Sequence, residues 1–124
     1  MPKQDALTKA ELALRSHAMT YPGVTEDFPW GERALKIKGK VFLFLSRHEE
    51  GVLSLSVKLP LSATYALGYA FAEPTGYGLG KHGWVSCKFV KGVEVPTELL
   101  TEWIDESFRA VAPKKVVAAL DKPD

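Results

Sequence analysis

The sequence predicts an α+β domain in which helices cover one face of an antiparallel sheet. Three strand-like segments follow one another between residues 33 and 59, so that neighbouring strands can pair through short hairpins. The most regular amphipathic helix comes later, between residues 96 and 111, rather than between these strands. Strands grouped together, with helices before and after them, are typical of an α+β layer and not of a parallel α/β sheet.

The first helix is expected from Thr8 to Thr20. Thr8 and Glu11 have the spacing of a capping box, in which each side chain bonds the backbone N–H of the other residue. Pro22 and Gly23 follow the apolar stripe and end the helix.

Three strands are expected next, at Arg33–Lys38, Val41–Leu45 and Val52–Leu59. The first and third alternate between apolar and polar residues, which predicts one buried and one outward face. The second is continuously apolar, as in a central strand. Gly39 and Gly51 supply the turns, so the three strands form an antiparallel meander.

The second half of the chain contains further helical and strand patterns. A helix is expected from Pro60 to Ala70, a strand from Trp84 to Phe89, an amphipathic helix after Pro96, and a short helix over 113–120. The order is therefore helix, three-stranded antiparallel meander, helix, one or two strands, helix and short C-terminal helix.

Composition predicts one domain over residues 1–124, long enough for its own core. No apolar run approaches the ~18 residues of a membrane span, so a membrane partner is not expected. The N-terminus lacks the apolar region of an export signal, and the single cysteine, Cys87, suits a reducing compartment. These features predict a cytoplasmic protein.

The net charge of +1 hides an uneven distribution. Residues 33–91 contain nine Lys or Arg and three Asp or Glu, whereas Glu and Asp dominate the next segment, with Arg109 as its one basic residue. The low total argues against a strongly basic nucleic-acid binder, but the uneven distribution allows a locally positive surface.

No catalytic or metal-binding arrangement emerges from the sequence. Residues 78–83 satisfy G-x-G-x-x-G literally, but a strand follows where a dinucleotide-binding loop needs a helix. The three histidines do not have the spacing of metal ligands, and Cys87 is expected to be a small buried residue in a strand. A non-enzymatic protein with no cofactor and no metal is expected.

The outward face of the sheet is the candidate binding surface. Small hydroxyls and lysines alternate there with aromatic residues, which suits phosphate contacts and base stacking. The predicted nucleic-acid contacts are Lys36, Lys38, Lys58, Tyr77, Lys81, His82, Trp84 and Lys88. The simpler interpretation is a sheet face that Lys and Ser keep soluble, with Trp84 partly buried under a helix.

Several motifs carry a resemblance to the MmcQ/YjbR family, in consistent order from the first helix to Leu120. They are Pro22-Gly23-Val24-Thr25-Glu26-Asp27-Phe28-Pro29-Trp30-Gly31, Lys38-Gly39-Lys40-Val41-Phe42, Leu55-Ser56-Val57-Lys58-Leu59-Pro60, Lys81-His82-Gly83-Trp84-Val85 and Ile104-Asp105-Glu106-Ser107-Phe108.

The resemblance implies a fold similar to secretion chaperones, with two strands after the second helix, the first of them over 75–79. Members of the family are described as predicted DNA-binding proteins with a double-wing motif. The polar and aromatic positions that match its motifs are Trp30, Lys40, Lys58, Lys81, His82 and Trp84. The glycine-rich stretch 76–80 departs from the family pattern.

Three hypotheses of function follow. The first is DNA binding through the Lys/Ser/aromatic sheet face and the glycine-rich loop. The second is a protein-interaction module, which predicts an exposed apolar patch used for partner binding or self-association. The third is a small-ligand or enzymatic pocket near Trp30, Lys58 and His82.

Overall fold

The computed structural model describes residues 6–28, 32–47, 51–76 and 78–121. Its strands are β1 Val24–Asp27, β2 Glu32–Ile37, β3 Lys40–Ser46, β4 Val52–Lys58, β5 Ala72–Pro74 and β6 Trp84–Val90. Its helices are α1 Ala6–Met19, α2 Ala63–Ala66, α3 Thr97–Val111 and α4 Lys114–Asp121, with a short 3₁₀ helix, η2, at Leu79–His82.

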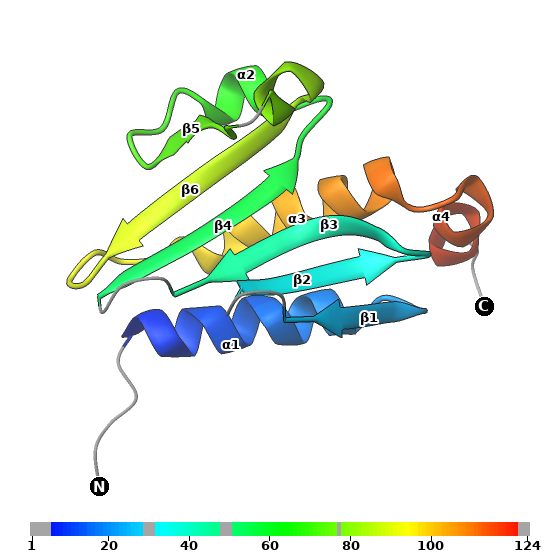
Figure 1. Ribbon diagram of the computed structural model, residues 1–124, viewed down its shortest axis with the longest axis horizontal. Coiled ribbons are helices and arrows are strands. Elements are labelled where there is room, and N and C mark those ends of the chain that lie inside the picture. The colour runs from blue at the N-terminus through cyan, green and yellow to red at the C-terminus, as the bar shows by residue number, and fades with distance from the viewer. Residues whose placement is uncertain (1–5, 29–31, 48–50, 77, 122–124) are drawn as a thin grey trace, which may run out of the picture.

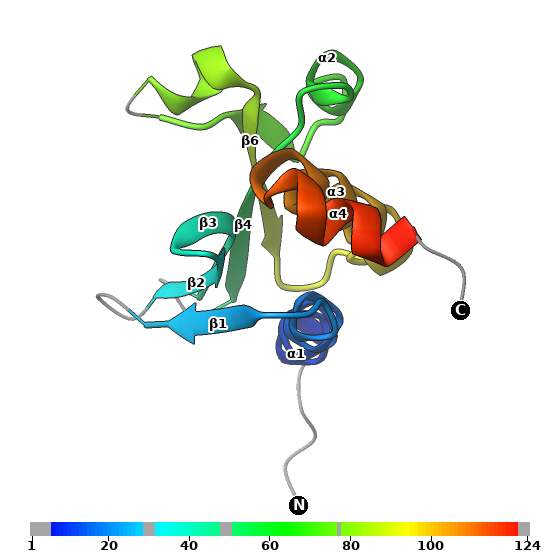
Figure 2. The same cartoon turned by 90° about the vertical axis from the view of Figure 1, so that its right-hand side faces the viewer.

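The strands form one antiparallel sheet in the order β1-β2-β3-β4-β6-β5, and helices cover one of its faces. Figure 1 shows α3 behind the sheet, and Figure 2 shows α1, α3 and α4 together on the side opposite β2 and β3. The α+β fold class expected from the sequence is confirmed.

The sequence did not predict β1. Its residues, Val-Thr-Glu-Asp, contain one apolar side chain, so neither burial nor alternation marks them as a strand. The strand pairs with β2 at the sheet edge, and its Glu26 accepts hydrogen bonds from Arg15 (2.8 and 3.0 Å) and Arg33 (3.1 Å). The hydrogen bond from Arg15 lowers the pKa of Glu26. Edge pairing and ion pairs therefore hold β1 in place.

The segment after β4 also differs from the expectation. Helix α2 is much shorter than the range 60–70, because the chain turns after Ala66 so that Tyr69 and Phe71 pack against the core. Their rings stack at 4.9 Å. The short strand implied over 75–79 lies earlier, at β5, and pairs with β6.

A β-bulge in β3 supplies an extra aromatic ring to the core. The register with β2 skips Phe42, and Phe42 and Leu43 are both fully buried. The Phe42 ring meets Phe108 of α3 edge-on at 5.1 Å, and Phe108 stacks on Tyr21 at 4.2 Å. These three aromatic rings join the sheet, α3 and the end of the first helix.

A serine from α3 completes the hydrogen bonding between β3 and β4 beside this bulge. The backbone N–H of Lys58 donates to Ser107 Oγ at 2.8 Å, and that hydroxyl donates to the carbonyl oxygen of Phe42 at 2.5 Å. Ser107 is fully buried, and its hydroxyl bridges these two backbone groups in place of a direct hydrogen bond between the strands.

Replacing this hydroxyl should destabilise the fold. Ser107→Ala leaves a buried N–H and a buried C=O without their shared partner, and we expect a loss of about 1–3 kcal/mol in the free energy of unfolding. Urea denaturation measures it. Thr101→Ala on the same helix is the control, because that hydroxyl bonds the Glu98 carbonyl at an exposed site. Equal losses in both variants would contradict the role given to Ser107.

Candidate nucleic-acid interface

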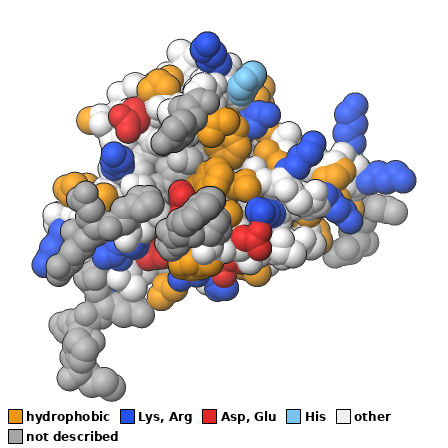
Figure 3. Space-filling model, in the orientation of Figure 1, with side chains coloured by type: hydrophobic (Ala, Val, Ile, Leu, Met, Phe, Trp, Pro, Cys, Tyr) orange, Lys and Arg blue, Asp and Glu red, His pale blue; other side chains and the backbone are white. Residues whose placement is uncertain are grey.

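We call the sheet face opposite α1 and α3 the outer face; Figure 3 shows it in surface view. The strand register identifies the side chains that share it. Phe44 lies opposite Ser56, Ser56 opposite Ser86, and Lys58 opposite Trp84. Neighbouring residues along each strand point into the core. Alternation in the sequence therefore places Lys58, Ser56 and Ser86 together on one surface, as the DNA-binding hypothesis requires.

The middle of the outer face is occupied by groups that bind one another. Ser86 Oγ lies 2.7 Å from Ser56 Oγ and 2.8 Å from Thr75 Oγ1. The Trp84 ring packs 5.9 Å from Phe44 and is only 9% exposed. This burial leaves too little of the indole free for stacking on a base, so Trp84 supports the surface rather than contacting a ligand.

Lys88 shares the outer face with Lys58 but lies far along it. Ser54 faces Lys88, and Lys58 is four residues further along β4, which separates the two lysines by about 13 Å. The Lys88 ammonium lies 4.0 Å from the Glu73 carboxylate. Lys36 has a closer acidic neighbour, Asp27, at 2.6 Å. The single lysine surface expected from the sequence is thus divided.

A basic cluster instead lies along one end of the sheet, where β2 and β4 finish and β3 and β6 begin. We call it the basic margin, and its members are Lys38, Lys40, Lys58, Lys81, Lys114 and Lys115. In Figure 3, Lys and Arg side chains line the upper and right-hand edges of the face.

Two contacts bring separate segments to this margin. Lys38 of the β2–β3 turn and Lys115 of α4 line the same shallow hollow, about 310 Å³ in volume. At the other end, the N–H of Leu59 donates to the carbonyl oxygen of Gly83 at 2.8 Å, which holds η2 beside the end of β4. Lys81 is therefore close in the fold to Lys58.

No described acidic residue neutralises the charges of the basic margin. Among the described residues, each arginine makes an ion pair with Asp or Glu, whereas none of the six lysines of the margin has such a partner within 4.0 Å. Lys38, Lys40, Lys81, Lys114 and Lys115 are also exposed. The margin presents positive charge that a ligand can neutralise.

The glycines next to Lys81 allow close packing of the chain. A Cβ on Gly80 would lie 2.8 Å from the Cβ of Pro74, and Gly83 has a φ of +86° against the Leu59 carbonyl. These glycines let η2 fold closely over β5 and β6 and expose Lys81 and His82. Tyr77 and Trp30, which the sequence also suggested, lie outside the described residues.

Sequence reasoning missed Lys114 and Lys115. Two adjacent lysines at the start of a short helix are visible in the sequence, but nothing there places α4 beside the β2–β3 turn. That placement comes from tertiary packing, because the apolar side of α4, with Val116 and Leu120, packs against the core.

The described residues offer little reactive chemistry. Burial raises the pKa of the Cys87 thiol to about 12, so this thiol stays protonated at neutral pH. Within the same residues, no three His, Cys, Asp or Glu side chains gather as metal ligands. None of the helices described combines the length and apolarity needed to cross a bilayer.

Comparisons with known proteins identify the family. No curated protein matches the sequence. The fold is similar to the crystal structure of a Deinococcus radiodurans protein with a DUF419 domain (25% identity, 90% of this chain and 87% of that chain, TM-score 0.68). It is also similar to a Pseudomonas syringae protein (15% identity, 81% and 97% covered, TM-score 0.60). The family model described as YjbR matches residues 19–110. The resemblance seen in the sequence is confirmed, and the chain belongs to the YjbR family.

Proposed function

We propose that this protein is a non-enzymatic, cytoplasmic DNA-binding protein and that the basic margin is its contact surface. One observation carries the proposal: six lysines from four segments of the chain lie at or beside one end of the sheet, with no acidic partner within 4.0 Å among the described residues. Phosphate oxygens are the natural partners of such a cluster. The resemblance to predicted DNA-binding proteins points to the same class of partner.

The expected mode of binding is contact with the phosphate backbone rather than reading of bases. The Trp84 ring is buried, and the outer-face hydroxyls of Ser56, Ser86 and Thr75 already bond one another. Lysine ammonium groups contact phosphates without regard to sequence. The protein should therefore bind duplexes of different sequence with similar affinity.

Salt dependence tests this proposal directly. If about five phosphates are neutralised, the logarithm of the binding constant should fall with the logarithm of salt concentration at a slope of roughly −4 to −5. Fluorescence anisotropy with two labelled duplexes of unrelated sequence, titrated at several KCl concentrations, measures both the slope and the sequence preference. A flat salt response, or no binding at low salt, would reject DNA as the partner.

A second candidate function, protein interaction, also has a specific observation in its favour. Leu61, Tyr65 and Leu67 are exposed large hydrophobic side chains in or beside α2. Such a group is typical of a binding surface for another protein. The third hypothesis, a pocket near Trp30, depends on a residue outside the described part of the chain.

A further inference from the structure

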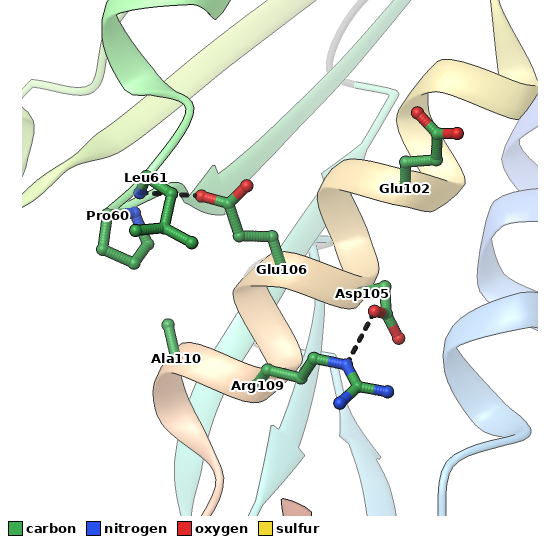
Figure 4. A pocket seen from close by; sticks show the side chains of 7 residues that line it. All are labelled: Pro60, Leu61, Glu102, Asp105, Glu106, Arg109 and Ala110. Atoms are coloured by element: carbon green, nitrogen blue, oxygen red, sulfur yellow. Dashed lines mark hydrogen bonds and ion pairs between the residues drawn. The ribbon is translucent and has the colours of Figure 1, made fainter. Parts of the chain in front are cut away.

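A groove lies on the helical side of the molecule, between the corner that follows β4 and the outward side of α3. Its volume is about 440 Å³, and its lining is Pro60, Leu61, Glu102, Asp105, Glu106, Arg109 and Ala110. Figure 4 shows Pro60 and Leu61 on one side and the α3 residues on the other. The apolar part of this surface faces solvent, because Leu61 is 89% exposed.

Hydrogen bonds fix Leu61 in this exposed position. The Glu106 carboxylate accepts the N–H of Leu61 at 2.9 Å, and the N–H and hydroxyl of Ser62 at 3.0 and 2.6 Å. These bonds join the corner to α3 (Figure 4). The three hydrogen bonds that Glu106 accepts from the corner hold Leu61 in its exposed position, so its side chain is pre-organised for contact with a partner.

The groove also carries negative charge. Three carboxylates line it, and its one cation, Arg109, is already engaged by Asp105 at 2.8 Å and by Asp121 at 2.8 and 2.9 Å. Asp105 additionally accepts the Tyr21 hydroxyl at 2.7 Å. Glu102 is exposed and has no ion pair among the described residues. A cationic group from a partner can therefore meet Glu102.

We propose that this groove docks a basic segment of another protein, in which a large apolar side chain packs on Leu61 and a neighbouring Lys or Arg meets Glu102. Complementarity of charge excludes an acidic or phosphorylated segment, because the groove has no free cation within the described residues. The groove lies on the helical side, away from the outer face, so the two surfaces can be tested separately.

A synthetic peptide serves as the probe. It carries Leu and Lys at the spacing of an amphipathic helix and a fluorescein label, and its counterpart has Glu in place of every Lys. Leu61→Asp should weaken binding of the Leu/Lys peptide at least about tenfold, because it removes the apolar anchor. Glu102→Lys should weaken it about three- to fivefold, as expected for a charge at the rim.

Matched variants separate a specific site from general attraction. Val93→Asp repeats the apolar-to-acid change at an exposed residue of the β6–α3 turn, and Glu98→Lys repeats the charge reversal one turn earlier on α3. Neither residue lines the groove. Both should keep wild-type affinity for the Leu/Lys peptide, and the double variant Lys58→Glu/Lys81→Glu should not weaken peptide binding.

Three outcomes would overturn the inference. They are failure of the Leu/Lys peptide to bind, equal binding of the Glu counterpart, and equal weakening by Val93→Asp and Leu61→Asp. Sedimentation equilibrium of the protein alone provides a further test. A self-associated state that Leu61→Asp dissociates would show that a second copy of this chain, rather than a basic partner, occupies the groove.

Discussion

Phe108→Ala is expected to lower the free energy of unfolding by about 3–5 kcal/mol. The Phe108 side chain is fully buried between Tyr21, on which it stacks, and Phe42, which it meets edge-on. Truncation removes the transfer energy of the ring and leaves a cavity between α3 and the sheet. A domain of this size has a total stability of about 5–15 kcal/mol, so a large part of it would be lost.

Urea denaturation followed by tryptophan fluorescence measures this loss. Phe28→Ala is the matched control, since the same truncation is made at a ring that is 54% exposed and lies 5.0 Å from the Arg33 guanidinium. That control should cost about 0.5–1 kcal/mol. Similar midpoints for the two variants would mean that the aromatic cluster does not hold the fold together.

Lys58→Glu combined with Lys81→Glu is expected to reduce DNA binding strongly and to change its salt dependence. Each lysine that contacts a phosphate contributes about one to the slope of the log–log salt plot, so the magnitude of the slope should fall by about two. The introduced carboxylates also repel the backbone. Both residues belong to the end of the sheet where no described acidic residue pairs with the margin lysines.

The control for this double variant makes the same change at the opposite end of the sheet. Lys91 is exposed, and its backbone N–H bonds the Gly51 carbonyl at 2.8 Å in the turn after β6. Lys91→Glu combined with Lys88→Glu changes the net charge by the same amount but should leave the slope nearly unchanged. If both double variants weaken binding equally, net charge rather than the basic margin explains the affinity.

Local signals in the sequence predict most of the fold. The apolar stripe of the first helix and the strict alternation from Val52 onward give elements that agree with α1 and β4 to within two residues. Thr8 is not the N-cap expected from the capping box, because it lies inside α1 and its Oγ1 accepts a hydrogen bond from Arg47. Glu11 likewise pairs with Arg33. β1 could not be found in this way, because its polar residues become a strand only through pairing with β2 and ion pairs to Glu26. The early end of α2 depends likewise on Tyr69 and Phe71 packing elsewhere.

The candidate site could be predicted only in part, for a similar reason. Alternation shows which face Lys58 and Lys88 share, but it does not reveal that Lys88 lies about 13 Å away beside Glu73. Alternation also cannot place Lys38 and Lys115 around the same hollow, since their segments are far apart in the sequence. Which face of a strand a residue occupies follows from its neighbours in the sequence, whereas the grouping of charges depends on the topology of the whole fold.

Two consecutive residues of α3 hold backbone segments that lead to different surfaces. Glu106 holds the corner that presents Leu61, while Ser107 bonds the backbone of Lys58 in the basic margin. A shift of this helical turn would move both attachments at once. If DNA and a basic peptide bind as proposed, α3 connects the two binding surfaces, and titrating one ligand in the presence of the other measures any cooperativity between them.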